Sequence, residues 1–209
     1  MRKVNFSFKI SYFEFSNLSY DGSIFHTHAV SKNGHYATTL ANVEGSPLAV
    51  GGSDPETNKA ETYDISTNTW TQIADYPYHS KLVFLGHPIV LKIYYRIYLF
   101  ATVSTEQGAL IIGGYDGSDV ATVACYNKAG WSRLEDLHYT RRNHRAIING
   151  DKVYVVGGYG TVVVDAFRYT EIWSFEENSL SIKLADPQLD EYWSYPELLL
   201  VDPSYCVKP

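Results

Sequence analysis

A pair of adjacent glycines closes a short apolar run at three places in this chain of 209 residues. The pairs are Gly51-Gly52, Gly113-Gly114 and Gly157-Gly158. Each pair is followed by a polar stretch, then by a segment centred on an aromatic residue, then by a further aromatic or apolar residue. Repetition of this kind predicts an array of similar structural units, because each unit buries its apolar surface against its neighbours. Abundant Tyr, Val, Thr and Gly favour strands and tight turns within these units.

The aromatic residues occupy corresponding positions in the three units. They are Tyr63 and Trp70 in the first unit, Tyr126 and Trp131 in the second, and Trp173 in the third, where Leu180 stands in place of the second aromatic. Large aromatic side chains on later strands can fill the space between adjacent sheets. Paired glycines at a strand end permit positive φ and close backbone approach. We therefore predict structural roles for the three glycine pairs and for these aromatic residues.

Three segments carry the whole pattern: AVGGSDPETNKAETYDISTNTW, IIGGYDGSDVATVACYNKAGW and VYVVGGYGTVVVDAFRYTEIWSFEENSL. In tandem they resemble the kelch repeat, whose family forms β-propellers, over about residues 35–184. The resemblance implies an all-β fold of four-stranded antiparallel blades. Propellers usually need about 4 to 8 blades to close, so three recognisable units predict an incomplete or small propeller.

The repeats divide the chain into five parts. We predict an N-terminal segment at residues 1–25 that is the remnant of a blade, repeats at residues 26–78, 79–138 and 139–184, and a tail or partial blade at residues 185–209. Open sheet edges at the ends of such an array invite pairing with another chain, so self-association is a further expectation.

Residues 81–100, KLVFLGHPIVLKIYYRIYLF, interrupt the period of the repeat. Gly51 and Gly113 are 62 positions apart, Gly113 and Gly157 are 44 apart, and the excess is 62 − 44 = 18. A membrane-spanning helix, a genuine insertion that needs a covering partner, and an artefact such as a retained intron are three interpretations. Lys92 and Arg96 oppose the first, because each costs about 2.5 to 3.5 kcal/mol in a bilayer. We favour the artefact, since removal of the segment restores the register of the repeat.

The charge composition limits the classes of partner that the chain can bind. The chain has 17 basic and 23 acidic residues, a formal net charge of −6 and no long basic run. It therefore carries no electrostatic footprint for nucleic acid or for an anionic membrane. The N-terminus lacks the apolar core of a signal peptide, and the two cysteines, Cys125 and Cys206, form no disulfide framework or metal-ligand motif. We expect a soluble protein, cytoplasmic or secreted, whose compartment the sequence leaves open.

A protein partner is the expected ligand. In a four-stranded meander, the loop after the second strand and the loop that enters the first strand open on the same face. In kelch propellers a face of this kind binds partner proteins, and Arg and Tyr are enriched at binding hot spots. The alternative is that these side chains are solvated or support the junction between blades. The candidate contact residues are Tyr115, Asp116, Tyr139, Arg141, Arg142, Arg145 and Tyr159, and an acidic peptide is their natural complement.

Enzyme motifs are scarce, and we predict no catalytic residue, cofactor or metal. No phosphate-binding loop, GxSxG or HExxH occurs. His26, His28 and His35 could ligate a metal, but neither a carboxylate nor a cysteine lies near them in sequence. A copper oxidase of galactose-oxidase type uses kelch-like blades and remains an alternative, although Cys125 beside Tyr126 does not match its cross-linked Tyr and Cys. A second alternative is a substrate-recruiting fragment of a ubiquitin-ligase adaptor.

Overall fold

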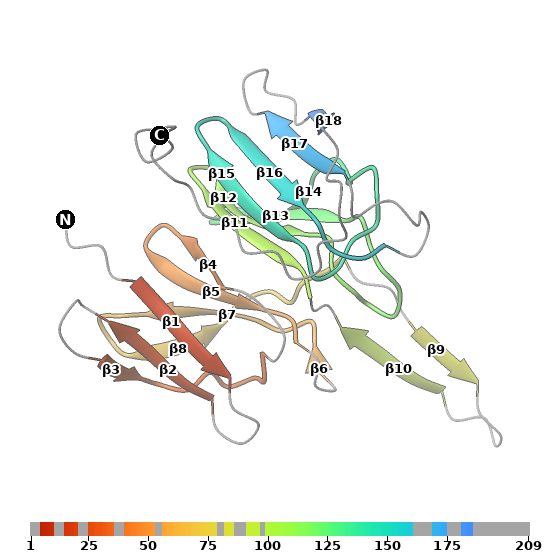
Figure 1. The fold of residues 1–209 in the computed structure, drawn as a ribbon. Coiled ribbons are helices and arrows are strands. Elements are labelled where there is room, and N and C mark those ends of the chain that lie inside the picture. The colour runs from red at the N-terminus through yellow and green to blue at the C-terminus, as the bar shows by residue number, and fades with distance from the viewer. Residues whose placement is uncertain are drawn as a thin grey trace.

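The computed structural model describes residues 5–10, 15–20, 25–35, 40–52, 56–78, 82–85, 91–96, 99–160, 169–174 and 181–185. These residues form strands and turns without any helix (Figure 1). No helix in this described part of the chain is long and apolar enough to cross a membrane. Leu180, Cys206 and residues 186–209 of the tail predicted at 185–209 lie outside the described residues.

Three consecutive four-stranded sheets make up most of the fold. Blade 1 contains β4 (Leu40–Val43), β5 (Ser46–Val50), β7 (Ala60–Asp64) and β8 (Thr69–Gln72). Blade 2 contains β11 (Ala101–Thr105), β12 (Gly108–Ile112), β13 (Val123–Asn127) and β14 (Gly130–Arg133). Blade 3 contains β15 (Arg145–Asn149), β16 (Lys152–Val156), β17 (Thr170–Ser174) and β18 (Ser181–Ala185). Each is an antiparallel meander in sequence order, as propeller blades are.

The first strands of the three blades lie side by side. Strand β11 contacts both β4 and β15, and the Thr102 hydroxyl donates to the Leu40 carbonyl at 2.9 Å. Every residue of β12 is buried, because blade 2 has a neighbour on each face. The burial of β16 alternates along the strand, as expected for a sheet with one covered face. Within the described residues the sheets do not close into a ring (Figure 1).

A three-stranded sheet precedes blade 1. It contains β1 (Asn5–Ile10), β2 (Phe15–Tyr20) and β3 (Phe25–His28), so its pairing continues three residues past the predicted boundary at residue 25. The Trp70 indole N–H donates to the Ala29 carbonyl at 2.8 Å just after β3. In the same way, Trp131 of blade 2 donates to Ala74, just after β8 of blade 1, at 2.9 Å. The outer edge of this sheet thus meets blade 1 much as blade 1 meets blade 2, although the domain boundaries stay predictions.

The described residues of the interrupting segment 81–100 form two strands and include the core residue Phe100. Strands β9 (Leu82–Leu85) and β10 (Leu91–Arg96) form a hairpin, and β10 pairs in parallel with β6 (Glu56–Thr57). Phe100 is 1% exposed and packs in the core between blades 1 and 2. The described parts of this segment are therefore strands and coil.

Candidate functional site

The segment at residues 141–144 lies between the loops of blades 2 and 3. Gly114 donates its N–H to the Arg141 carbonyl at 2.7 Å, and Arg141 donates its own to Val120 at 3.0 Å, both toward blade 2. Arg142 and Tyr159 exchange two backbone hydrogen bonds of 2.8 Å toward blade 3. The segment is thus held from both sides, and its side chains have fixed positions at the junction.

Glycine is required where this segment passes closest to the blades. Gly113 has a φ of 59°, and a Cβ on it would lie 2.8 Å from both the Arg141 carbonyl oxygen and His144 Cε1. Gly158 has a φ of 89°, and its Cβ would lie 2.6 Å from the Arg142 carbonyl oxygen. Real Cβ atoms do not make such contacts, so a larger residue would push the segment out of the junction.

Arg142 is a partly exposed cation at this junction. Its guanidinium carbon lies 4.9 Å from the centre of the Tyr115 ring and 5.9 Å from that of Tyr159, which are the residues directly after the glycine pairs of blades 2 and 3. Its Nε forms an ion pair with Asp119 at 3.3 Å. The Arg142 side chain is 33% exposed, whereas that of Asp119 is 1% exposed. Cation–π contact of this kind fixes an arginine while one part of it stays accessible.

Arg141, the neighbouring residue, points inward. Its Nε donates to Glu171 Oε1 at 3.0 Å and its Nη1 donates to the Gly157 carbonyl at 2.9 Å. Both side chains of the ion pair are fully buried, and His138 donates its backbone N–H to Glu171 Oε2 at 2.6 Å. Burial lowers the pKa of Arg141, and the Glu171 carboxylate opposes that shift. The pair therefore fastens the entering loop of blade 3 to its third strand.

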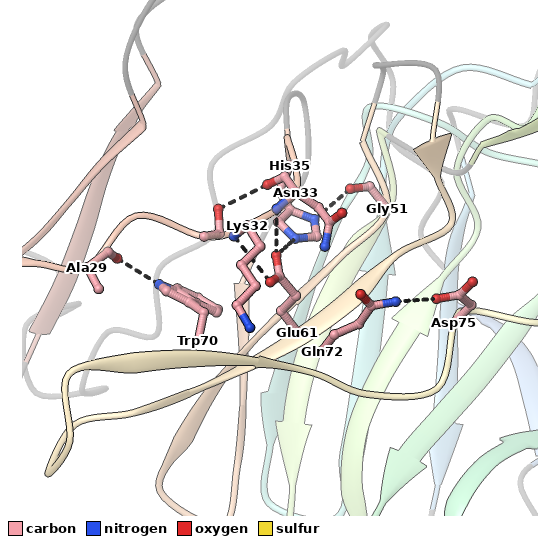
Figure 2. Close-up of polar contacts among 10 residues, drawn as sticks. Ala29, Lys32, Asn33, His35, Gly51, Glu61, Trp70, Gln72 and Asp75 are labelled. Carbon is pink, nitrogen blue, oxygen red and sulfur yellow. Dashed lines mark hydrogen bonds and ion pairs between the residues drawn. The ribbon is translucent and has the colours of Figure 1, made fainter.

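A second buried carboxylate, Glu61, fastens the loop that enters blade 1 to the third strand of that blade (Figure 2). His35 bridges Glu61 Oε2 through Nε2 at 3.0 Å and the Gly51 carbonyl through Nδ1 at 2.7 Å. The backbone N–H groups of Lys32 and Asn33 donate to the two carboxylate oxygens at 3.2 and 3.0 Å. Burial alone would raise the pKa of Glu61, but the hydrogen bonds from His35 and Asn33 and the charge of His35 hold it below its ordinary value.

The comparisons with known proteins agree with the fold. A family model described as the Kelch motif matches residues 48–75, which run from β5 to just beyond β8. The chain carries a kelch motif. A solved structure titled "Structure of YjhT" is similar with a TM-score of 0.66 and 14% sequence identity, covering 85% of this chain and 60% of that one. The chain therefore spans less than two thirds of that protein, and the likeness is one of fold. No curated protein sequence matches the chain.

The kelch-type blades separate the predicted contact residues into two groups. Tyr115, Tyr139, Arg142, Arg145 and Tyr159 are partly exposed. Tyr139 stacks on Tyr169 with ring centres 5.1 Å apart and an interplanar angle of 11°. By contrast, Asp116 is 2% exposed and Arg141 is fully buried. Their prediction as contact residues is corrected by this placement, because a partner cannot reach a side chain that the fold encloses.

The structural residues predicted for the kelch blades lie between or at the ends of the sheets. All six residues of the glycine pairs have positive φ. Tyr63, Trp70 and Trp173 are at most 5% exposed, and Tyr126 and Trp131 are half-buried with ring centres 4.8 Å apart. In the third blade Trp173 occupies the place that Tyr63 and Tyr126 hold in the others.

His28 and His35 are hydrogen-bonded to groups of the protein. The Tyr63 hydroxyl is hydrogen-bonded to His28 Nδ1 at 2.8 Å, and His35 serves the buried carboxylate of blade 1. Cys125 is a free, buried thiol whose pKa is raised by burial. Among the residues that the structure describes, no group of three His, Cys, Asp or Glu side chains could hold a metal ion.

Sequence reasoning missed the two buried carboxylates and His144, which is fully buried at the junction. A signal for the carboxylates is present. Glu61 and Glu171 each precede the aromatic of the third strand by two positions, and the residue that binds each one lies 16 positions before the first glycine of its pair. Blade 2 has Ala124 at the carboxylate position, so the feature is not common to all three repeats.

Proposed function

We propose that this chain is a non-catalytic kelch-repeat module that binds a protein partner through an acidic segment. The binding surface would be the loop face at the junction of blades 2 and 3, centred on Arg142. The observation that carries the proposal is the position of this arginine, 33% exposed and held against Tyr115 and Tyr159. Arginine beside tyrosines, supplied by loops of two blades, is the composition that binding hot spots favour.

The chemistry of this face fits a carboxylate partner. A guanidinium has five N–H donors and binds carboxylates through two parallel hydrogen bonds. The ion pair to Asp119 uses Nε, and a partner carboxylate would approach the terminal nitrogens. Backbone hydrogen bonds between Arg142 and Tyr159 hold the loop in place, so little ordering entropy opposes binding. Tyr139 and Arg145 would extend the same surface along blade 3.

A peptide array tests the proposal. The purified full chain is applied to peptides rich in Asp and Glu and, on the same array, to their Lys-substituted counterparts. We expect saturable binding to acidic peptides, lost in Arg142→Ala and retained in Arg133→Ala. Arg133 is a matched control, because it is 52% exposed on β14 and is paired with Asp136 at 2.6 Å. Equal binding to both kinds of peptide, or equal binding by both variants, would refute the proposal.

A further inference from the structure

The first turns of blades 2 and 3, between β11 and β12 and between β15 and β16, border a common cavity. Because each blade is a meander, these turns lie at the opposite end of the strands from the loops that hold Arg142. The cavity has a volume of about 420 Å³ and is lined by Thr105, Glu106, Gln107, Ile148, Gly150 and Asp151. Ligand pockets in proteins measure about 300–1,000 Å³, so a side chain of a partner can enter it.

Two carboxylates line this cavity without a cation between them. Glu106 is exposed, and its carboxylate forms no ion pair or hydrogen bond with the described residues. Asp151 accepts the Ser174 hydroxyl at 3.0 Å through Oδ2, which leaves Oδ1 for another donor. The adjacent Lys152 lies on the opposite face of β16 from Val153, which packs in the core between blades 2 and 3. The cavity therefore presents negative charge to a ligand.

Hydrogen bonds hold the blade 2 side of the cavity in place. The Thr105 hydroxyl accepts the Gln107 N–H at 3.2 Å and donates to the Gly108 carbonyl at 2.9 Å. The side-chain amide of Asn127 donates to the Gln107 carbonyl at 3.2 Å. Gly108 lies so close to β13 that a Cβ on it would be 2.3 Å from the Tyr126 carbonyl oxygen. A turn fixed in this way loses little entropy when a ligand binds.

The lining combines an apolar wall with acceptor groups. Ile148 packs against the core between blades 2 and 3 and reaches the cavity. A lysine side chain lays its methylene groups along an apolar surface of this kind and keeps its charged end among polar groups. Its ammonium has three donors, and Glu106, Asp151 and the Gln107 amide supply acceptor oxygens from two separate turns. This arrangement suits a compact ammonium better than the planar guanidinium of arginine.

We propose that this cavity binds a lysine side chain of a partner protein. The charge complementarity between an ammonium and the two carboxylates favours this occupant, and the wall formed by Ile148 favours its aliphatic stem. The site is separate from the face centred on Arg142, because it uses other turns and the opposite charge. It therefore stands or falls independently of the function proposed above.

Nuclear magnetic resonance titration of the full chain tests the site. The probe is a short blocked peptide with one central lysine between alanines and glycines. Its acetyl-lysine form is the matched control, because acetylation removes the charge and keeps the stem. The lysine peptide should shift the signals of the Ile148 methyl groups and the Glu106 amide saturably, and the acetyl-lysine peptide should not. This comparison uses the wild type and does not depend on how well a variant folds.

Variants then assign the binding to the two carboxylates. Glu106→Gln and Asp151→Asn should each raise the dissociation constant about twofold to fivefold, as for partly exposed ion pairs, and the double variant about tenfold. Glu44→Gln should have no effect, because Glu44 occupies the corresponding turn of blade 1 and is paired with Lys128. Arg142→Ala should also have none. Equal shifts with both peptides, or an unchanged dissociation constant in the double variant, would overturn the proposal.

Discussion

Replacement of Arg141 by alanine should lower the free energy of unfolding substantially. The change removes the cation that faces Glu171 while both side chains are fully buried. It also removes the donor to the Gly157 carbonyl. Breaking a buried ion pair on one side costs about 3–5 kcal/mol, because the remaining charge stays buried without its partner. A domain has about 5–15 kcal/mol of stability in total, so the loss is a large part of it.

Urea unfolding, followed by tryptophan fluorescence, measures this loss. With an m-value of about 1–3 kcal/mol/M, a loss of about 3–5 kcal/mol should lower the midpoint of Arg141→Ala by about 1–5 M. Arg133→Ala is the control, because it removes an arginine that is 52% exposed and is paired with Asp136, itself 40% exposed, so it should cost about 1 kcal/mol or less. Arg141→Leu combined with Glu171→Leu should recover much of the loss, since it leaves no unpaired charge. An Arg141→Ala protein as stable as Arg133→Ala would refute the buried bridge.

Two further predictions concern the junction of blades 2 and 3. Gly113→Ala should cost about 2 kcal/mol or more of folding stability, whereas Gly150→Ala should cost about 1 kcal/mol. The two glycines have φ values of 59° and 62°, but of the two only Gly113 would place a Cβ against neighbouring atoms. Equal midpoints of unfolding in urea would contradict this close approach. Burial and the charge of Arg141 lower the pKa of His144 to about 3. Because the unfolded chain binds a proton there at higher pH, folding stability should fall by about 1.4 kcal/mol for each pH unit as the pH drops from about 6.5 to 3. His144→Gln should have a shallower slope when unfolding is measured across that range.

The repeat was predictable because backbone strain and packing leave marks in the sequence. Positive φ selects glycine, and the space between sheets selects large aromatics, so paired glycines and aromatic spacing predicted repeated units. Their resemblance to the kelch repeat implied four-stranded blades. The third blade shows the same rule with Trp173 in the place of tyrosine. The paired glycines and the spaced aromatics each depend on one residue and its local backbone, so they can be recognised in a single sequence.

The site was harder to predict because burial depends on partners far along the chain. Arg141 and Arg142 are adjacent and look alike in sequence, yet one meets Glu171 thirty positions later and the other meets Tyr115. Because side chains of neighbouring extended residues point in opposite directions, only one of the two can face solvent. The choice between them required the position of Glu171 in the sheet.

The most direct test of the proposed binding face is the dissociation constant of an acidic peptide for three proteins. The wild type, Arg142→Ala and Arg133→Ala are titrated by calorimetry with the peptide that binds best on the array. The geometry predicts a dissociation constant at least about tenfold higher for Arg142→Ala, as for a hot-spot residue, and an unchanged one for Arg133→Ala. Equal affinity of all three proteins would contradict a binding face centred on Arg142.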